Sequence, residues 1–181
     1  MITVNINNVE EAGNGPNLIA PGGYVGKIVN VKNMPDMQGL VVELDVAEGP
    51  EAGHFQKLNA DLGFWALSNF RSYKERALPF FKKFVKSVER SNEGYTWDGD
   101  ENKLVGKLIG MVLQHEEYEG NDGKIKTKVT VNSFDSIAKI RNGEFKIPEK
   151  KILEKSNRNN EVVDNSASGF QPLNDDDIPF A

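Results

Sequence analysis

Residues 40–46 read LVVELDV, and their alternation is the clearest structural signal in the chain. Leucine or valine occupies every second position, and Val41, Glu43 and Asp45 lie between them. Because successive side chains of a strand point to opposite faces of the sheet, this pattern predicts a strand with one buried face. The other face is acidic, and we do not expect it to contact phosphate.

The neighbouring sequence predicts four more strands. GGYVGKIVNVKN, at 22–33, is rich in β-forming residues and ends at the turn-like MPDMQG. GHFQKLNA, at 53–60, predicts a shorter third strand. KLVGKLIGMVLQHEEY (103–118) and KIKTKVTVNSF (124–134) predict a hairpin, because the EGNDG between them is a tight turn with Asp-Gly at its tip.

A helix is expected between the third and fourth strands. Pro79 suits the first turn of a helix, and phenylalanine and valine then recur at three- and four-residue spacing. The residues assigned to this apolar face and to the core are Phe80, Phe81, Phe84, Val85 and Val88. The outer face, which is either simply solvated or an electrostatic funnel for a polyanion, carries Lys82, Lys83, Lys86 and Arg90. FWALSNFRSYKERAL, at 64–78, predicts a second, shorter helical segment.

Three strands, a helix and two strands follow one another in the order of the OB fold. This fold is a small five-stranded barrel that often binds oligonucleotides. We therefore predict a mainly β protein with an OB-fold domain at 21–150, preceded by an N-terminal arm at 1–20. Residues 151–181 are expected to form a flexible linker and an acidic tail, because SNRNNEVVDNSAS (156–168) is too polar to bury a core.

Charge is segregated along the 181 residues. The net charge is -5, yet residues 71–90 contain seven basic residues and only two acidic ones. Local fields of this kind, rather than the total charge, steer polyanions. The chain has no cysteine, no signal-peptide pattern and no apolar run long enough to span a membrane, so we expect a cytoplasmic protein without disulfides.

Catalytic motifs are not evident in the sequence. His54 and His115 stand apart, and no phosphate-binding loop or nucleophile elbow occurs. We therefore predict that the protein is not an enzyme and needs no cofactor or metal.

Binding features are better represented than catalytic ones. Lys124, Lys126 and Lys128 would share one face of the last strand, spaced about 7 Å apart. Such a row either follows phosphates along a nucleic acid strand or protects an exposed sheet edge from pairing. The further phosphate-binding candidates are Arg71, Lys74 and Arg76. The candidates for base stacking are Phe55, Trp65 and Tyr118, although Tyr118 also suits ordinary packing across the hairpin.

The end of the chain joins an acidic cluster to an apolar tip, DDDIPF at 175–180. This segment resembles the acidic C-terminal tip of bacterial single-stranded DNA-binding proteins. The body is similar to phage-encoded single-stranded DNA-binding proteins in SYKERALPFFKKFVKSVERSN (72–92) and LVGKLIGMVLQHEEYEGNDGKIK (104–126). In the bacterial family the tip usually ends on phenylalanine, whereas Ala181 follows Phe180 here.

The resemblance implies a protein that coats single-stranded DNA during phage replication or recombination, in the host cytoplasm, with homo-oligomers possible. It implies that replication or recombination proteins bind the tip, and the tip residues are Asp175, Asp176, Asp177, Ile178, Pro179 and Phe180. An alternative function is an OB-like interaction adaptor or phage structural component whose acidic tail only increases solubility. A nuclease ranks third, because no carboxylate cluster is evident.

Overall fold

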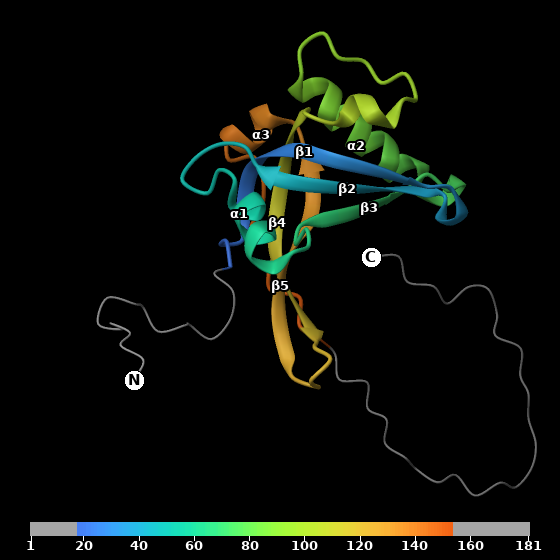
Figure 1. Ribbon diagram of the computed structural model, residues 1–181. Helices are drawn as coiled ribbons and strands as arrows, with labels where there is room; N and C mark the ends of the chain where they lie inside the picture. The colour runs from blue at the N-terminus through green and yellow to red at the C-terminus, as the bar shows by residue number, and fades with distance from the viewer. Residues whose placement is uncertain (1–17, 154–181) are drawn as a thin grey trace, which may run out of the picture.

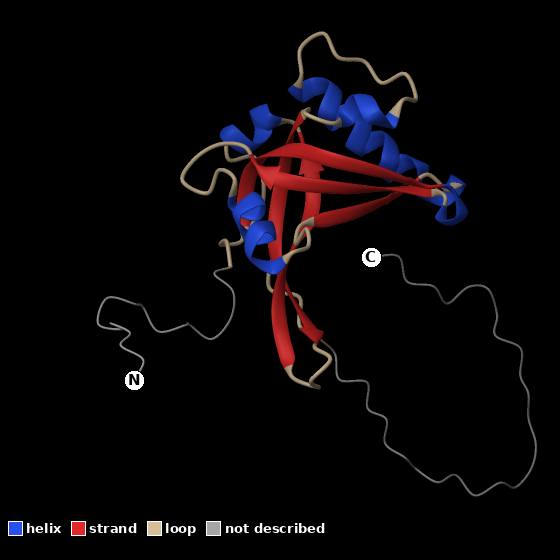
Figure 2. Ribbon diagram, in the orientation of Figure 1, coloured by secondary structure: helices blue, strands red, loops and turns tan. Residues whose placement is uncertain are grey.

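The computed structural model of the chain describes residues 18–153. They form a five-stranded antiparallel sheet with the strand order β3-β2-β1-β4-β5, and helices connect or follow the strands (Figures 1 and 2). The predicted mainly β fold, with a helix between the third and fourth strands, is thereby confirmed. The strands are β1 (Gly22–Met34), β2 (Gly39–Val46), β3 (Ser68–Ser72), β4 (Leu108–Glu119) and β5 (Ile125–Asp135), and the helices are α1 (His54–Leu62), α2 (Leu78–Ser91) and α3 (Ile137–Arg141).

The sheet curls until its two outer strands approach each other. The side-chain amide of Asn69, on β3, donates a hydrogen bond of 3.5 Å to the backbone carbonyl of Val131, on β5. Strand β1 pairs with β2 along one edge and with β4 along the other. Register shifts at Ile28/Asn30 and at Val112/Leu113 bend the sheet, as β-bulges do. The β4–β5 hairpin extends beyond the curled sheet (Figure 1).

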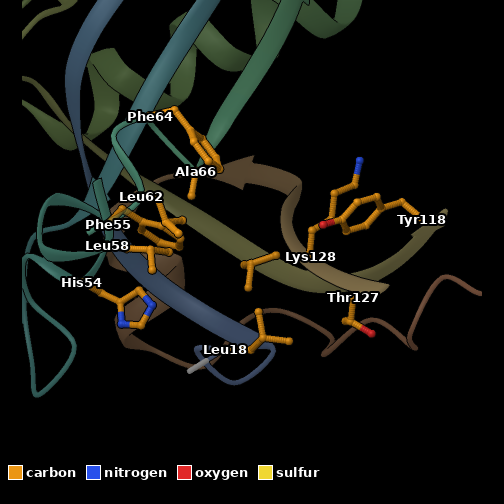
Figure 3. A pocket seen from close by; sticks show the side chains of 11 residues that line it. Leu18, His54, Phe55, Leu58, Leu62, Phe64, Ala66, Tyr118, Thr127 and Lys128 are labelled. Carbon is orange, nitrogen blue, oxygen red and sulfur yellow. The ribbon is translucent and has the colours of Figure 1, made fainter. Parts of the chain in front are cut away.

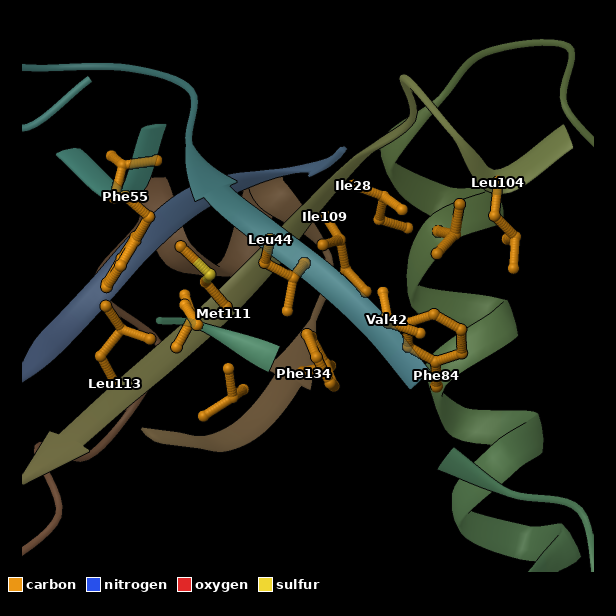
Figure 4. Packing of buried hydrophobic residues seen from close by; sticks show 14 of the residues in the cluster. Ile28, Val42, Leu44, Phe55, Phe84, Leu104, Ile109, Met111, Leu113 and Phe134 are labelled. Carbon is orange, nitrogen blue, oxygen red and sulfur yellow. The ribbon is translucent and has the colours of Figure 1, made fainter. Parts of the chain in front are cut away.

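One hydrophobic core fills the inside of this sheet. Leu40, Val42, Leu44 and Val46 are at most 3% exposed, which confirms the buried face predicted for residues 40–46. Figure 4 shows Phe55 toward one end of the cluster and Phe84 and Leu104 toward the other, with β2 and β4 side chains between them. Each fully buried side chain of this size contributes about 1.5–3 kcal/mol to folding.

The third strand predicted at 53–60 is wrong, because this segment forms helix α1. Gly53 adopts a left-handed conformation (φ 73°) that turns the chain into the helix. Phe55, Leu58 and Leu62 then recur at helical spacing, and the first two pack on the core while Leu62 remains 44% exposed. The true third strand begins at Ser68, eight residues after the end of the segment predicted as a strand.

Asp45 explains why α1 starts where it does. The carboxylate is 5% exposed and accepts hydrogen bonds from the backbone N–H groups of Phe55 (2.9 Å) and Gln56 (3.3 Å) in the first turn of α1. These groups have no partner within the helix itself. Asp45 is therefore a structural residue, although the alternation of β2 alone places it on an outer face.

Replacing Asp45 by alanine is expected to lower the free energy of unfolding by about 1–3 kcal/mol, because two N–H groups of α1 and that of Val46 lose a charged acceptor. Glu43→Ala is the matched control: Glu43 lies on the same strand, is half-buried and, among the described residues, bonds only the Asn30 side chain. It should cost less than about 1 kcal/mol. Urea unfolding of both variants measures the difference, and equal losses would contradict a capping role for Asp45.

The short helix predicted at 64–78 is also wrong. Residues 68–72 form strand β3, which pairs with β2 from Ser72 opposite Gly39 to Ser68 opposite Glu43. Only Glu75–Ala77 makes a single helical turn. Serine and asparagine are poor helix formers, and pairing with β2 decides the conformation of this segment.

Helix α2 follows the prediction except at Phe80. Phe84, Val85 and Val88 are buried and Phe81 is half-buried, but Phe80 is 69% exposed. At 100° per residue, Phe80 lies about 90° from the centre of the buried face. The core assignment of Phe80 is therefore wrong, and its aromatic ring lies on the surface.

Candidate nucleic-acid interface

The hairpin lysines show the alternation expected of a strand that is buried on one face. Lys126 and Lys128 are exposed, whereas Val129 and Val131 are buried. Lys124 is exposed as well, but it precedes β5 and lies in the turn. Of the three lysines predicted to share one face of the strand, two lie on β5 and the third lies in the turn before it.

Carboxylates accompany these lysines on the hairpin. Lys126 lies 3.2 Å from Asp122, whose pKa is lowered mainly by this hydrogen bond. Lys128 lies 4.0 Å from Glu116, which also pairs with Lys151. A phosphate group at this position would compete with these carboxylates, so the hairpin is a weaker electrostatic site than its lysines suggest.

Tyr118 offers an aromatic surface beside Lys128. Its side chain is 37% exposed, and the ammonium group of Lys128 lies 5.6 Å from the ring centroid. Tyr118 and Lys126 are directly opposite each other in the β4–β5 register. A base stacked on Tyr118 would thus have two ammonium groups nearby.

The two other stacking candidates are held by the core. Phe55 is 1% exposed, so its ring has no face available to a base, and the prediction for Phe55 is wrong in this structure. Trp65 is half-buried, packs against the core and donates its indole N–H to the carbonyl of Leu44 at 3.0 Å. The sequence could not separate these residues from surface aromatics, because their burial depends on α1 and the turn after it.

Arg71 occupies an unusual environment where β3 approaches β5. Its guanidinium carbon lies 4.8 Å from the ring centroid of Phe134, and its Nε donates to the side-chain oxygen of Asn69. Burial lowers the pKa of Arg71 from its ordinary value. Within residues 18–153 no carboxylate forms an ion pair with Arg71, so its charge is partly desolvated without a neutralising partner.

A cavity of about 180 Å³ opens beside Arg71. Phe80 and Lys83 of α2 line it on one side, and Asn132 and Phe134 of β5 line it on the other. We call this site, defined by Arg71, Phe80, Lys83 and Asn132, the Arg71 cleft. It joins a cation, an exposed aromatic ring and a polar amide, which are the groups that bind phosphate and base in single-stranded nucleic acids.

Lys74 and Arg76 lie between β3 and α2, next to the Arg71 cleft in sequence, and both are exposed. Lys82 and Lys83 follow in the first turns of α2. None of these four cations forms an ion pair with the carboxylates that the structure describes. The positive region predicted at 71–90 is therefore least neutralised at its N-terminal part.

Strand β5 connects the Arg71 cleft with the hairpin. Lys128 and Asn132 are both exposed and lie four residues, or about 13 Å, apart along the strand, with Asn132 at the register shift of β5. The sequence pattern did not predict Phe80 and Asn132 as members of this surface. The position of Phe80 at the margin of the apolar face of α2 could have indicated its exposure. Asn132 joins this surface only because β3 folds against β5, which no local pattern indicates.

The remaining sequence predictions concern the C-terminal tip, metal binding and the membrane. The proposed partner-binding residues 175–180 lie outside the described residues. Within residues 18–153, no group of three histidine, aspartate or glutamate side chains is arranged to hold a metal ion, and no helix is long and apolar enough to cross a membrane.

The comparisons with known proteins supply no relative from which residue roles can be transferred. The chain matches no family model, and no curated protein shows significant similarity to it.

Proposed function

We propose that this chain is a single-stranded DNA-binding protein that coats DNA through the Arg71 cleft and the β5 side of its barrel. The observation that carries the proposal is Arg71 itself. A partly desolvated guanidinium that has no carboxylate partner among residues 18–153, beside an exposed phenylalanine, is suited to a phosphate next to a stacked base. Binding of this kind needs no catalytic group.

The strand pairing supports an OB fold as the framework. Strand β1 pairs with both β2 and β4, and β3 approaches β5 at Asn69 and Val131. A helix separates the third and fourth strands. A partly open barrel of five strands is the architecture in which OB folds present a face and loops to oligonucleotides.

A nucleic acid strand on this surface would run along β5. Phe80 and Tyr118 would stack on bases at the two ends, because both rings are exposed. Arg71 and Lys83 would neutralise phosphates at the first end, and Lys128 at the second, where Glu116 competes. A duplex cannot use the aromatic rings in this way, because its bases are already stacked.

The proposed function is tested by titrating the full chain with fluorescent oligo-dT and with a duplex of equal length at several salt concentrations. We expect tighter binding to the single strand and a linear fall of log K with log salt, by about 0.7 per phosphate contact. Equal affinity for both ligands, or no binding at low salt, would contradict it.

The alternative is an OB-like adaptor or structural component that does not bind DNA. The neutralised hairpin favours this function, since Lys126 and Lys128 already have carboxylate partners. The Arg71 cleft favours DNA binding, and the oligo-dT titration separates the two. In the DNA-binding case, the protein would act in phage replication or recombination in the host cytoplasm and recruit partner proteins through residues 175–180.

The hairpin contribution can be measured separately. Changing Lys124, Lys126 and Lys128 to glutamate is expected to weaken oligo-dT binding and to lower the salt slope by at most about 2, the value for three lost phosphate contacts. Because two of these lysines are paired already, we expect a smaller loss than at the Arg71 cleft. An unchanged slope together with new self-association would show that the lysines protect an edge strand instead.

A further inference from the structure

An apolar pocket of about 210 Å³ lies between α1 and the β4–β5 hairpin, apart from the Arg71 cleft. Figure 3 shows side chains of α1 and the following loop on one side, hairpin side chains on the other, and Leu18 at the lower edge. Phe64 is 60% exposed and Leu62 44% exposed at its rim. The lining is mostly apolar, its polar members are His54, Tyr118, Thr127 and Lys128, and part of it is open to solvent.

One wall of the pocket is the outer edge of β5, which carries Thr127 and Val129. Paired residues of an antiparallel ladder alternate between hydrogen-bonded and non-hydrogen-bonded pairs. His115 and Glu117, which pair with Val129 and Thr127, direct their backbone groups away from β5: the His115 carbonyl accepts from Lys151 N–H (2.9 Å), and the Glu117 N–H donates to the Lys151 carbonyl (2.8 Å). The backbone groups of Thr127 and Val129 therefore point away from β4.

Val131 gives independent evidence for this orientation. It lies two residues beyond Val129 on β5, and its carbonyl accepts the Asn69 side chain from β3. The carbonyl thus points outward, and Val129 and Thr127 follow it at the two-residue period of a strand. In the described part of the chain, no segment hydrogen-bonds these outward groups of Thr127 and Val129.

A free strand edge beside an apolar pocket has the features that bind an extended peptide. The peptide adds a strand through backbone hydrogen bonds, and its alternate side chains enter the pocket. The occupant must present apolar side chains, at every second position, to the aliphatic and aromatic part of this lining.

The N-terminal residues of the chain meet these requirements. MITVNIN has Ile2, Val4 and Ile6 at alternate positions, with uncharged Thr3 and Asn5 between them. The described chain starts at Leu18, which itself lines the pocket. The eleven residues between Ile6 and Leu18 span up to about 36 Å, so the segment can return to the pocket in the same molecule. We propose that residues 2–6 add a strand to the outer edge of β5 and place Ile2, Val4 and Ile6 in this pocket.

The C-terminal tip is a poorer occupant. In Ile178-Pro179-Phe180 the central proline has no N–H to donate to a strand edge. The chain also reaches its last described residues along the opposite edge of the hairpin, where Lys151 bridges to Glu116 of β4.

Amide hydrogen exchange of the full chain, resolved by residue with NMR, tests the proposal. We expect the amides of Thr127 and Val129 to be protected in the native chain. A variant with aspartate at Ile2, Val4 and Ile6 should lose this protection at least tenfold, while Lys126 and Lys128, whose N–H groups face β4, stay protected.

The matched control places aspartate at Thr3, Asn5 and Asn7, which adds the same charge on the other face of the strand and should leave the protection in place. Two results would overturn the proposal. One is rapid exchange of Thr127 and Val129 in the native chain. The other is protection that persists in the Ile2, Val4 and Ile6 variant, because another segment would then occupy the edge.

Disulfide trapping shows whether the strand comes from the same molecule or from a second copy. The chain has no cysteine of its own, so any cross-link must join the two introduced cysteines. Val4→Cys combined with Leu58→Cys is expected to give a disulfide-linked monomer under mild oxidation. Thr3→Cys combined with Leu58→Cys should not cross-link. A covalent dimer would mean that a second copy supplies the strand. Absence of a cross-link from Leu58→Cys to each of Ile2→Cys, Val4→Cys and Ile6→Cys would contradict the docking.

Discussion

Replacing Phe80 by alanine is expected to weaken oligo-dT binding by about 1–3 kcal/mol, or roughly 5- to 150-fold, and to leave the salt slope unchanged. The ring is 69% exposed beside Arg71, so its removal should take away a stacked base without disturbing the core. Lys83→Gln should have the complementary effect, with a slope lower by about 0.7 for one lost phosphate contact. The double variant should show both changes.

Matched controls lie on α1 and the loop after it. Phe64 is also strongly exposed, at 60%, but it lines the other pocket, and Lys57 is an exposed lysine of α1. Phe64→Ala and Lys57→Gln should leave oligo-dT binding within about twofold of the native chain. Equal weakening by Phe64→Ala and Phe80→Ala would assign the effect to general surface hydrophobicity and contradict a stacking role for Phe80.

The local patterns of the sequence were sufficient for much of the fold. The alternation of Leu40, Val42 and Leu44 depends only on period two, and the hairpin depends on two apolar runs joined by Asp-Gly, so both were predictable. Helix α1 was not predictable, because its first turn is capped by Asp45, a residue of the preceding strand. Its apolar pattern also spans too few residues to be distinguished from that of a strand.

The candidate site was less predictable than the fold. Arg71 was expected to contact phosphate, but its stacking on Phe134 arises only when β3 closes against β5, across more than 60 residues of sequence. Phe80 differs from Phe84 only by its place at the margin of the helical face and in the first turn. Burial of Phe55 and exposure of Phe80 both depend on packing between elements, which hydrophobic periodicity does not specify.

The positive charge around the Arg71 cleft could attract the acidic C-terminal residues as well as DNA. The described chain ends beside the hairpin, where the Leu153 N–H donates to the Glu117 carboxylate at 3.3 Å. The residues from 154 to 174 span up to about 70 Å when extended, which is enough to bring Asp175, Asp176 and Asp177 to the Arg71 cleft. If the aspartates compete with DNA there, the competition must weaken as salt screens the charges.

Deleting residues 170–181 is therefore expected to raise oligo-dT affinity at low salt by about 1–2 kcal/mol, since each exposed ion pair contributes about 0.2–1 kcal/mol. The gain should shrink toward zero as salt increases. Changing the three aspartates to asparagine in the full-length chain is the matched control and should reproduce the gain. A salt-independent gain, or none at all, would show that the aspartates do not compete for the DNA surface.

Phe180→Ala is expected to separate competition from recruitment. This variant retains all three aspartates, so oligo-dT affinity should stay close to that of the native chain, whereas a partner protein with an apolar pocket should lose its main anchor, a loss of at least about 2 kcal/mol. Binding of purified candidate replication proteins to the native and variant chains measures the loss, and equal binding would exclude Phe180 as an anchor.

Removing Ala181 alone makes Phe180 the last residue, so that the terminal carboxylate belongs to Phe180. Tighter binding would then show that the partner recognises the chain end, and unchanged binding would show that it recognises the side chains of Ile178 and Phe180 only.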